Sequence, residues 1–168
     1  IFSRTTREGP KLFDLRDACR GAIALTAQRY RATGIAVQER LGDEPLTMTG
    51  HQPLVEQVLV AILGNARDVL AEMPRQDREV VVSTTRRPDG RLIVRVSDNG
   101  PGVPEAVRDR IFEPFFTTKP EGQGTGLGLA VAYGIVRDAG GSLTLEPGEG
   151  GATFQIELPA NTPGGAGR

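Results

Sequence analysis

The sequence predicts an α/β (α+β) two-layer sandwich, with three long helices packed on one face of a mixed, mainly antiparallel sheet. Two observations predict this fold class. Stretches with apolar residues three or four positions apart, typical of helices, are interspersed with short stretches of alternating apolar and polar residues, typical of strands. Their order is helix, strand, helix, hairpin, long connection, helix, hairpin, which favours helices on one side of a sheet.

The composition bounds the possible functions. The 168 residues suit one domain with a sizeable core, and a net charge of −1 with both signs interspersed offers no basic face for nucleic acid. The single Cys19 excludes an internal disulfide framework and fits a reducing compartment. The apolar stretches are too short, or too interrupted by Gly, to span a bilayer. We therefore expect a cytoplasmic domain without a nucleic-acid partner.

The chain starts with Ile1 rather than Met and looks like a piece of a longer protein. Residues 1–10 are polar and end in Gly-Pro, so we expect the end of a preceding element followed by a linker. Residues 11–160 form the predicted domain. Residues 161–168 are rich in Gly and Pro and are expected to be a disordered tail.

The first helix is predicted over residues 12–31, with Asp14 able to cap it and Gly34 ending it. Residues 35–41 alternate apolar and polar side chains and predict a strand, and residues 46–49 predict a short extended piece. The expected buried stripe of this helix consists of Leu15, Ala18, Ala22, Leu25 and Ala27.

The second helix is predicted from Pro53 to about Ala71, since proline suits the first turn of a helix. Asn65 lies on or beside its apolar face. A buried amide needs hydrogen-bond partners, so Asn65 is either a core residue satisfied by backbone or a side chain aimed into a ligand or metal site. The segment alone leaves both readings open. The expected core face consists of Leu54, Val58, Leu59, Ile62, Ala66, Val69 and Leu70.

Residues 79–86 and 91–97 predict a hairpin, because a Pro-Asp-Gly turn separates two alternating stretches. The second strand is followed by Asp98 and then by Gly100 and Gly102. A carboxylate at a strand end can accept a hydrogen bond from an exocyclic amine, while the glycines allow close backbone approach. The same residues also fit an ordinary Asx turn.

Residues 111–120 contain three of the six Phe residues, and their prolines exclude a regular strand. They follow a short predicted helix at 104–110 and belong to a connection, residues 100–124, that is long for a compact domain. Such long connections are usually functional lids or disordered. A segment this aromatic must either pack on another part of the protein or act as a hinged cover, so we expect an aromatic lid here.

Glycines alternate at positions 122, 124, 126 and 128, directly before a third predicted helix over residues 125–139. A glycine-rich loop that opens a helix presents free N–H groups beside the positive end of the helix dipole, which suits a phosphate group. A merely flexible loop is the alternative. Residues 142–146 and 152–158 predict a closing hairpin.

These segments, in this order, resemble the motifs of the GHKL ATPase superfamily, and in particular the ATP-binding catalytic domain of bacterial sensor histidine kinases. The resemblance covers roughly residues 12–159. The motifs are the N box in residues 57–68, the first G box in 98–102, the F box in 111–119, the second G box in 122–130 and a last Gly-rich motif in 150–154.

The resemblance implies ATP and Mg²⁺ as cofactors. Asn65 matches the asparagine that ligates Mg²⁺ and contributes to catalysis, and Asp98 matches the acid that binds the adenine amine. Lys119 lies where a lid cation could meet a phosphate and is the second expected catalytic residue. Further expected nucleotide-binding residues are Asp68, Gly100, Gly102, Phe112, Thr118, Gly124, Thr125, Gly126, Leu127, Gly128 and Thr153.

Two positions depart from the family pattern. Many kinases carry a second Asn, and the ATP-hydrolysing relatives carry a water-activating Glu, where this chain has Ala61. Alanine can do neither job, which argues against an autonomous ATPase. His51, the only histidine, precedes a predicted helix in a context unlike that of the family's phosphoacceptor.

The resulting hypothesis is a histidine kinase catalytic domain that donates the γ-phosphoryl group of Mg-ATP to a His on a separate dimerisation domain, for relay to the receiver Asp of a response regulator. The fragment is expected to be monomeric and unable to autophosphorylate, and the parent to be a homodimer that a membrane anchor could hold. Residues 1–10 would then include the end of the dimerisation helix. The alternatives are a pseudokinase module, a GHKL ATPase and an anti-sigma-type serine kinase.

Overall fold

The computed structural model describes residues 8–74, 77–117, 126–146 and 150–161. Most of the predicted linker and tail therefore lies outside the described residues. The same holds for four of the predicted site residues, namely Thr118, Lys119, Gly124 and Thr125.

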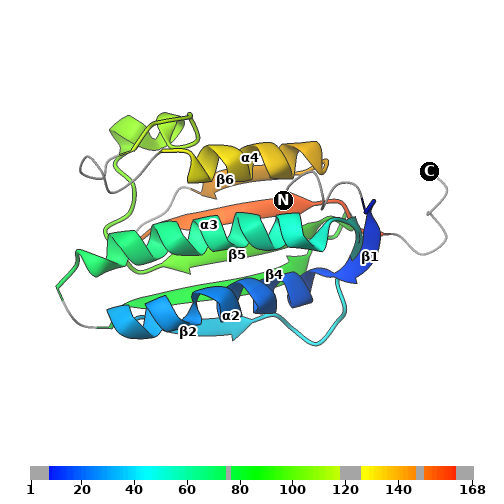
Figure 1. The fold of residues 1–168 in the computed structure, drawn as a ribbon, viewed down its shortest axis with the longest axis horizontal. Helices are drawn as coiled ribbons and strands as arrows, with labels where there is room; N and C mark the ends of the chain where they lie inside the picture. The colour runs from blue at the N-terminus through cyan, green and yellow to red at the C-terminus, as the bar shows by residue number, and fades with distance from the viewer. Residues whose placement is uncertain (1–7, 75–76, 118–125, 147–149, 162–168) are drawn as a thin grey trace.

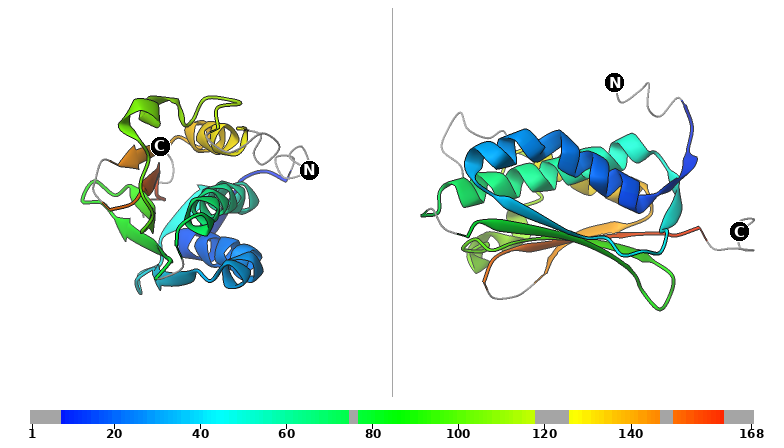
Figure 2. Two further views of the ribbon diagram at one scale, coloured as in Figure 1. Left: turned by 90° about the vertical axis from the view of Figure 1, so that its left-hand side faces the viewer. Right: turned by 90° about the horizontal axis from the view of Figure 1, so that it is seen from below.

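The predicted two-layer architecture is confirmed, with the helices on one face of the main sheet (Figures 1 and 2). The helical elements of the described residues are α2 (Leu15–Thr33), α3 (Gln52–Ala71), the 3₁₀ helix η1 (Glu105–Arg110) and α4 (Gly128–Asp138). The main sheet has the order β2-β4-β5-β7-β6, made of β2 (Ala36–Arg40), β4 (Glu79–Arg86), β5 (Leu92–Asp98), β7 (Thr153–Leu158) and β6 (Ser142–Glu146). A separate ribbon pairs β1 (Lys11–Asp14) with β3 (Thr47–Gly50).

The sheet is mixed, as predicted. Strand β2 runs parallel to β4, whereas the strand pairs β4–β5, β5–β7 and β7–β6 are antiparallel. Alternate residues of the central strand β5, from Leu92 to Asp98, point toward the helices, because side chains alternate between the two faces of a strand. Within the described residues, no helix combines the length and the apolar character needed to cross a bilayer.

The predicted start of the first helix was wrong. Residues 11–14 form strand β1, whose Leu12 and Phe13 pair with Thr49 and Met48 of β3. The helix begins at Leu15, and the Asp14 carboxylate caps it by accepting a hydrogen bond from the backbone N–H of Arg16 at 2.9 Å. The cap was therefore identified correctly, while the residues before it pair with a strand that is distant in the sequence.

The predicted apolar stripe of the first helix also needs correction. In α2 the buried stripe continues from Ala22 to Thr26 and Tyr30, four residues apart, whereas Leu25 is 69% exposed. In α4, which contacts α3 and the β6–β7 hairpin, the buried residues are Ala132 and Val136.

Tyr30 joins helices α2 and α3 and makes a testable contribution to stability. Its hydroxyl donates a buried hydrogen bond to the Leu63 carbonyl at 2.6 Å. We expect Tyr30→Phe to lower the free energy of unfolding by about 1–2 kcal/mol, because the buried carbonyl loses its side-chain donor. Urea denaturation measures the change. Tyr133→Phe, at a ring that is 41% exposed, is the matched control and is expected to change stability by less than about 0.5 kcal/mol. Equal effects would contradict the assignment.

Candidate functional site

Asp98 ends strand β5 and anchors the loop that follows it. Its side chain is only 8% exposed, and its Oδ1 accepts hydrogen bonds from the backbone N–H of Gly100 at 2.9 Å and of Ala152 at 3.3 Å. The backbone N–H of Asp98 in turn donates to the Ala152 carbonyl at 2.9 Å. Both side-chain hydrogen bonds end on Oδ1, so Oδ2 is the oxygen on which a ligand amine could bind.

The electrostatics of Asp98 fit a ligand-binding carboxylate. Burial raises its pKa above the ordinary value, although the N–H groups of Gly100 and Ala152 favour the charged form and act in the opposite direction. A buried carboxylate with only partial compensation gains most from an incoming hydrogen-bond donor. The environment therefore makes Asp98 a good acceptor for an amino group.

Glycines let the two loops beside Asp98 touch. A Cβ on Gly151 would lie 1.9 Å from the Asp98 carbonyl oxygen, and a Cβ on Gly102 would lie 3.2 Å from the Gly151 carbonyl oxygen. Both glycines have positive φ, at +127° and +83°. A Cβ on Gly100 would be 3.0 Å from Asp98 Oδ1 and 3.2 Å from Val69 of helix α3. The loop after β5 is thus pressed between the closing hairpin and α3.

One face of α3 links this loop to the second glycine motif. Ala61, Asn65 and Val69 are four residues apart and therefore share a helix face. Val69 lies against the position of Gly100, whereas Ala61 lines a recess of about 200 Å³ together with residues that include Leu127 and Gly128. Half-buried Asn65 lies between these two contacts. The structure therefore brings Asn65, the Asp98 loop and the start of α4 to one region.

The described part of the predicted lid contacts α4, β7 and the residue Gly126 before α4. The Phe112 ring packs on Tyr133 of α4, with ring centroids 5.4 Å apart, and on Phe154 of β7 at 6.2 Å. The backbone N–H of Phe115 donates to the Gly126 carbonyl at 2.7 Å. Phe115 has a positive φ of 68° and is 73% exposed, and a Cβ on Gly126 would lie 2.3 Å from its carbonyl carbon. Only glycine fits at position 126.

Three other predicted residues lie in distinct places. Asp68 follows Asn65 on α3 and forms an ion pair with Arg67 at 3.0 Å. Gly128 is the first residue of α4, and a Cβ there would meet no atom of the described residues within 4 Å. Thr153 hydrogen-bonds through its hydroxyl to Ser97 at 2.9 Å. Because the adjacent Phe154 points into the core, the Thr153 side chain lies on the face of the sheet away from Asp98.

Several residues of this site were not assigned by sequence reasoning. Val69 and Leu70 form the wall behind Gly100, and Ala152 supplies a backbone donor to Asp98. The positive φ of Phe115 was also missed. The signal for the first two was weak, since Val69 and Leu70 look like any core residues. The pair Gly150-Gly151 was the available signal for the close approach at Ala152.

The described residues offer little metal coordination of their own. No group of three or more His, Cys, Asp or Glu side chains within them could hold a metal ion. Mg²⁺ keeps several waters and is commonly bound by one or two protein oxygens plus substrate phosphates. The Asn65 amide oxygen is compatible with such a site, and the start of α4 provides N–H groups for phosphate.

Comparison with known proteins gives consistent matches. The family model described as "Histidine kinase-, DNA gyrase B-, and HSP90-like ATPase" matches residues 50–162. The two-component sensor PprA of Pseudomonas aeruginosa is 38% identical over 99% of this chain. The chain covers only 18% of PprA and 26% of the C4-dicarboxylate transport sensor DctB of the same organism, at 34% identity, and thus spans a minor part of these relatives.

Solved structures agree with the sequence matches. Full-length ShkA in complex with AMPPNP has a TM-score of 0.78 and 28% identity, with coverage of 92% of this chain and 32% of ShkA. Histidine kinase ThkA in complex with the response regulator protein TrrA has a TM-score of 0.74 and 25% identity, with coverage of 93% of this chain and 43% of the ThkA chain. The match extends over both layers of the fold.

Proposed function

Because the chain belongs to the histidine kinase-, DNA gyrase B- and HSP90-like ATPase family, we propose that residues 11–160 bind Mg-ATP as the catalytic domain of a two-component sensor histidine kinase. The observation that carries the proposal is the convergence of Asp98, Asn65 and the start of α4 around one face of α3. The similarity to ShkA, whose structure contains AMPPNP, supports a nucleotide as the ligand.

Each residue would have a separate task. Asp98 would accept the adenine amine, and Gly100 and Gly102 would let the ring approach the backbone. The N–H groups at the start of α4 would bind phosphate oxygens, and Asn65 would hold Mg²⁺, which neutralises phosphate charge. Phosphoryl transfer needs mainly positioning and electrostatic stabilisation. Lys119, Thr118, Gly124 and Thr125 remain predicted ligand contacts on the lid and glycine loop.

The phosphoryl acceptor would be a His outside this domain. His51, the only histidine here, lies at the N-terminal end of α3. At about 1.5 Å per residue, His51 is about 20 Å along the helix from Asn65, too far for direct transfer. We propose a separate dimerisation domain as the source of the acceptor His, a homodimeric parent, and a response regulator as the final acceptor. The ThkA complex with TrrA supports the last partner. A cytoplasmic location belongs to the same proposal.

Two measurements test this function. Calorimetric titration of the purified chain is expected to show ATP binding that strengthens with Mg²⁺. Labelled γ-phosphate is expected to appear on histidine in the full-length parent and not in the isolated chain. Absence of ATP binding at about 1 mM, a free energy of about 4 kcal/mol, would overturn the nucleotide site. Labelling of the isolated chain would overturn the need for an external acceptor.

The pH dependence of binding follows from Asp98. Since burial raises its pKa, Asp98 takes up a proton at a higher pH than an ordinary aspartate, and the protonated acid is a poorer acceptor for an amine. We expect affinity for adenosine, which has no phosphate to titrate, to fall as the pH is lowered through the raised pKa. Because its pKa is raised in the folded state, the folded state binds this proton more readily than the unfolded state. Lowering the pH through the raised pKa therefore increases the contribution of Asp98 to stability while it decreases the affinity for adenosine. Calorimetry across acidic pH checks this, and Asp98→Asn should flatten the profile.

Ala61 motivates a second candidate, a pseudokinase module that binds nucleotide without transfer. Alanine at this position supplies neither a metal ligand nor a general base, and the recess beside it is lined largely by apolar residues. A full-length parent that binds ATP but forms no phosphohistidine would favour this candidate. Steady ATP turnover by the isolated chain would instead favour a GHKL ATPase, and serine phosphorylation of a protein substrate would favour an anti-sigma-type kinase.

A further inference from the structure

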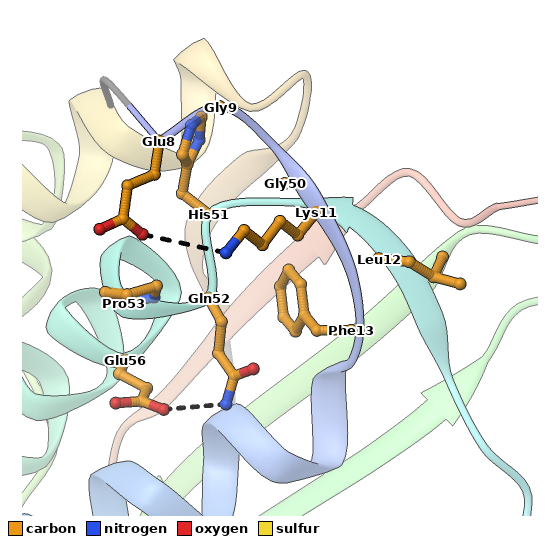
Figure 3. Close-up of a pocket in the computed structure, with 10 residues that line it drawn as sticks. All are labelled: Glu8, Gly9, Lys11, Leu12, Phe13, Gly50, His51, Gln52, Pro53 and Glu56. Atoms are coloured by element: carbon orange, nitrogen blue, oxygen red, sulfur yellow. Dashed lines mark hydrogen bonds and ion pairs between the residues drawn. The ribbon is translucent and has the colours of Figure 1, made fainter. Parts of the chain in front are cut away.

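A second cavity lies at the opposite end of α3 from the proposed nucleotide site. Figure 3 shows the residues around it, which come from residues 8–9, the ribbon strand β1, the end of β3 and the first two turns of α3. We call it the α3 N-terminal pocket. Its volume is about 400 Å³, within the usual range for small-molecule sites. The main lining side chains are those of Lys11, Phe13, His51, Gln52, Pro53 and Glu56.

The pocket wall has one apolar side, formed by Phe13 and Pro53. Leu12, the neighbouring residue on β1, is 62% exposed and points to the other side of the strand in Figure 3. The Phe13 ring packs over Gly50, because a Cβ there would lie 3.7 Å from the ring and 3.3 Å from the end of Met48. A flat apolar body could lie on the part of half-buried Phe13 that remains exposed.

Polar groups occupy the other side in a defined arrangement. Gln52 donates through its side chain to Glu56 Oε2 at 3.1 Å. A Cβ on Gly21 of α2 would lie only 2.8 Å from the same oxygen, so the absence of a side chain at Gly21 makes room for the carboxylate. The position of Glu56 is thus set by both α2 and α3, which is the preorganisation that a binding group needs.

His51 contributes an unpaired nitrogen to this wall. It occupies the N-cap position of α3 without capping the helix through its side chain. Its Nε2 is buried and has no hydrogen-bond partner among the residues that the structure describes. Buried polar atoms are rarely left unpaired, and each exception calls for an explanation. A turn of the imidazole about its Cβ–Cγ bond, a soft torsion, would let a ligand hydroxyl supply the missing partner.

The charges around the pocket favour a cation. Among the described residues that line the pocket, the charged groups are the carboxylates of Glu8 and Glu56 and the ammonium group of Lys11, which is 74% exposed and reaches Glu8 only at 4.0 Å. The positive end of the α3 dipole offsets about half of one carboxylate, and the balance of these lining groups stays negative. An ammonium group would be attracted here, and the Phe13 ring adds a favourable surface for a cation.

We propose that the α3 N-terminal pocket binds a small organic amine with a flat aromatic body and a hydroxyl group. The aromatic body would lie on Phe13 and Pro53, the ammonium group beside Glu56, and the hydroxyl group within reach of His51. The site is independent of the nucleotide site, because the first turn of α3 is about 20 Å from Asn65 along the helix.

The test uses tyramine as the probe and the full chain as the protein. Tyramine is expected to shift the amide signals of Gly9, Gly50 and Gln52 in a saturable way in ¹H–¹⁵N spectra, and to leave those of Gly100 and Gly102 unchanged. The matched probe 4-hydroxyphenylacetate has the same ring and hydroxyl group with the opposite charge. We expect it to bind at least about fivefold more weakly, and phenethylamine, which lacks the hydroxyl group, to bind more weakly as well.

Variants locate the charge that matters. Glu56→Gln keeps the shape of the side chain and is expected to weaken tyramine binding about fivefold, while Glu39→Gln on the exposed strand β2 should change nothing. Equal binding of the two opposite charges, an unaffected Glu56→Gln variant, or shifts centred on Gly100 would overturn the proposal. Binding that appears only after deletion of residues 1–7 would also overturn it, because the pocket would then belong to the chain's own N-terminal segment.

Discussion

Replacing Asp98 with asparagine is expected to weaken ATP binding about 100-fold while the domain stays folded. The carboxylate has acceptor capacity on both oxygens, and two backbone N–H groups already occupy Oδ1. An asparagine must turn its single oxygen either toward those N–H groups or toward the adenine amine. One of the two interactions is lost in either orientation, at a cost of about 2–3 kcal/mol for a hydrogen bond to a charged group.

Stability is expected to respond differently from affinity. Burial already disfavours the charged form of Asp98, so removal of the charge offsets the loss of its charge-assisted hydrogen bonds. We expect the free energy of unfolding to change by less than about 1 kcal/mol. Calorimetry and urea denaturation on the same sample separate the two quantities. Asp138→Asn, on the exposed surface of α4, is the control for both. A large loss of stability with unchanged affinity would make Asp98 a purely structural residue.

Local sequence patterns were sufficient to predict those elements whose conformation depends on residues close by in the sequence. In β5 the alternation from Leu92 to Ser97 indicated a half-buried strand, and Asp98 continues the buried side. The turn before it, with Asp89 and Gly90, predicted the hairpin of β4 and β5 that the structure confirms. The place of Asp98 at the end of a strand therefore followed from a two-residue period and a turn signal.

Patterns failed where a structure depends on residues distant in the sequence. Strand β1 has only four residues, and its conformation is stabilised by pairing with β3, about 35 positions later in the chain. Leu25 has the spacing of a buried residue, but the shift to Thr26 and Tyr30 follows the direction in which α2 crosses α3. A single sequence contains no information about that crossing.

The candidate site divides in the same way. Asp98, Gly100 and Gly102 could be identified because glycine next to an acid at a strand end has a chemical meaning. The wall of Val69 and Leu70 could not, since contact between a helix and a loop depends on the packed fold. Candidate residues for the site could therefore be proposed from the sequence, whereas the shape of the site could not.

Replacing Gly151 with alanine is expected to lower the free energy of unfolding by more than about 3 kcal/mol. A Cβ would lie 1.9 Å from the Asp98 carbonyl oxygen, which is backbone and cannot rotate away, and the φ of +127° is strained for any residue with a side chain. The chain must shift at Gly151, and Ala152 must shift with it. The hydrogen bonds between Ala152 and Asp98 would then break, so ATP affinity should fall together with stability.

Gly150→Ala separates the steric contact from the general cost of losing a glycine. Gly150 also has a positive φ, of 74°, but a Cβ there would meet no atom within 4 Å in the part of the chain that the structure describes. We expect it to cost only about 1 kcal/mol, the strain of alanine in a left-handed conformation. Thermal and urea unfolding of both variants measure the difference. Similar losses of unfolding free energy in the two variants would mean that backbone strain alone requires glycine at positions 150 and 151. A loss confined to Gly151→Ala would show that the contact with Asp98 requires glycine, which ties the last Gly-rich motif to the ligand carboxylate.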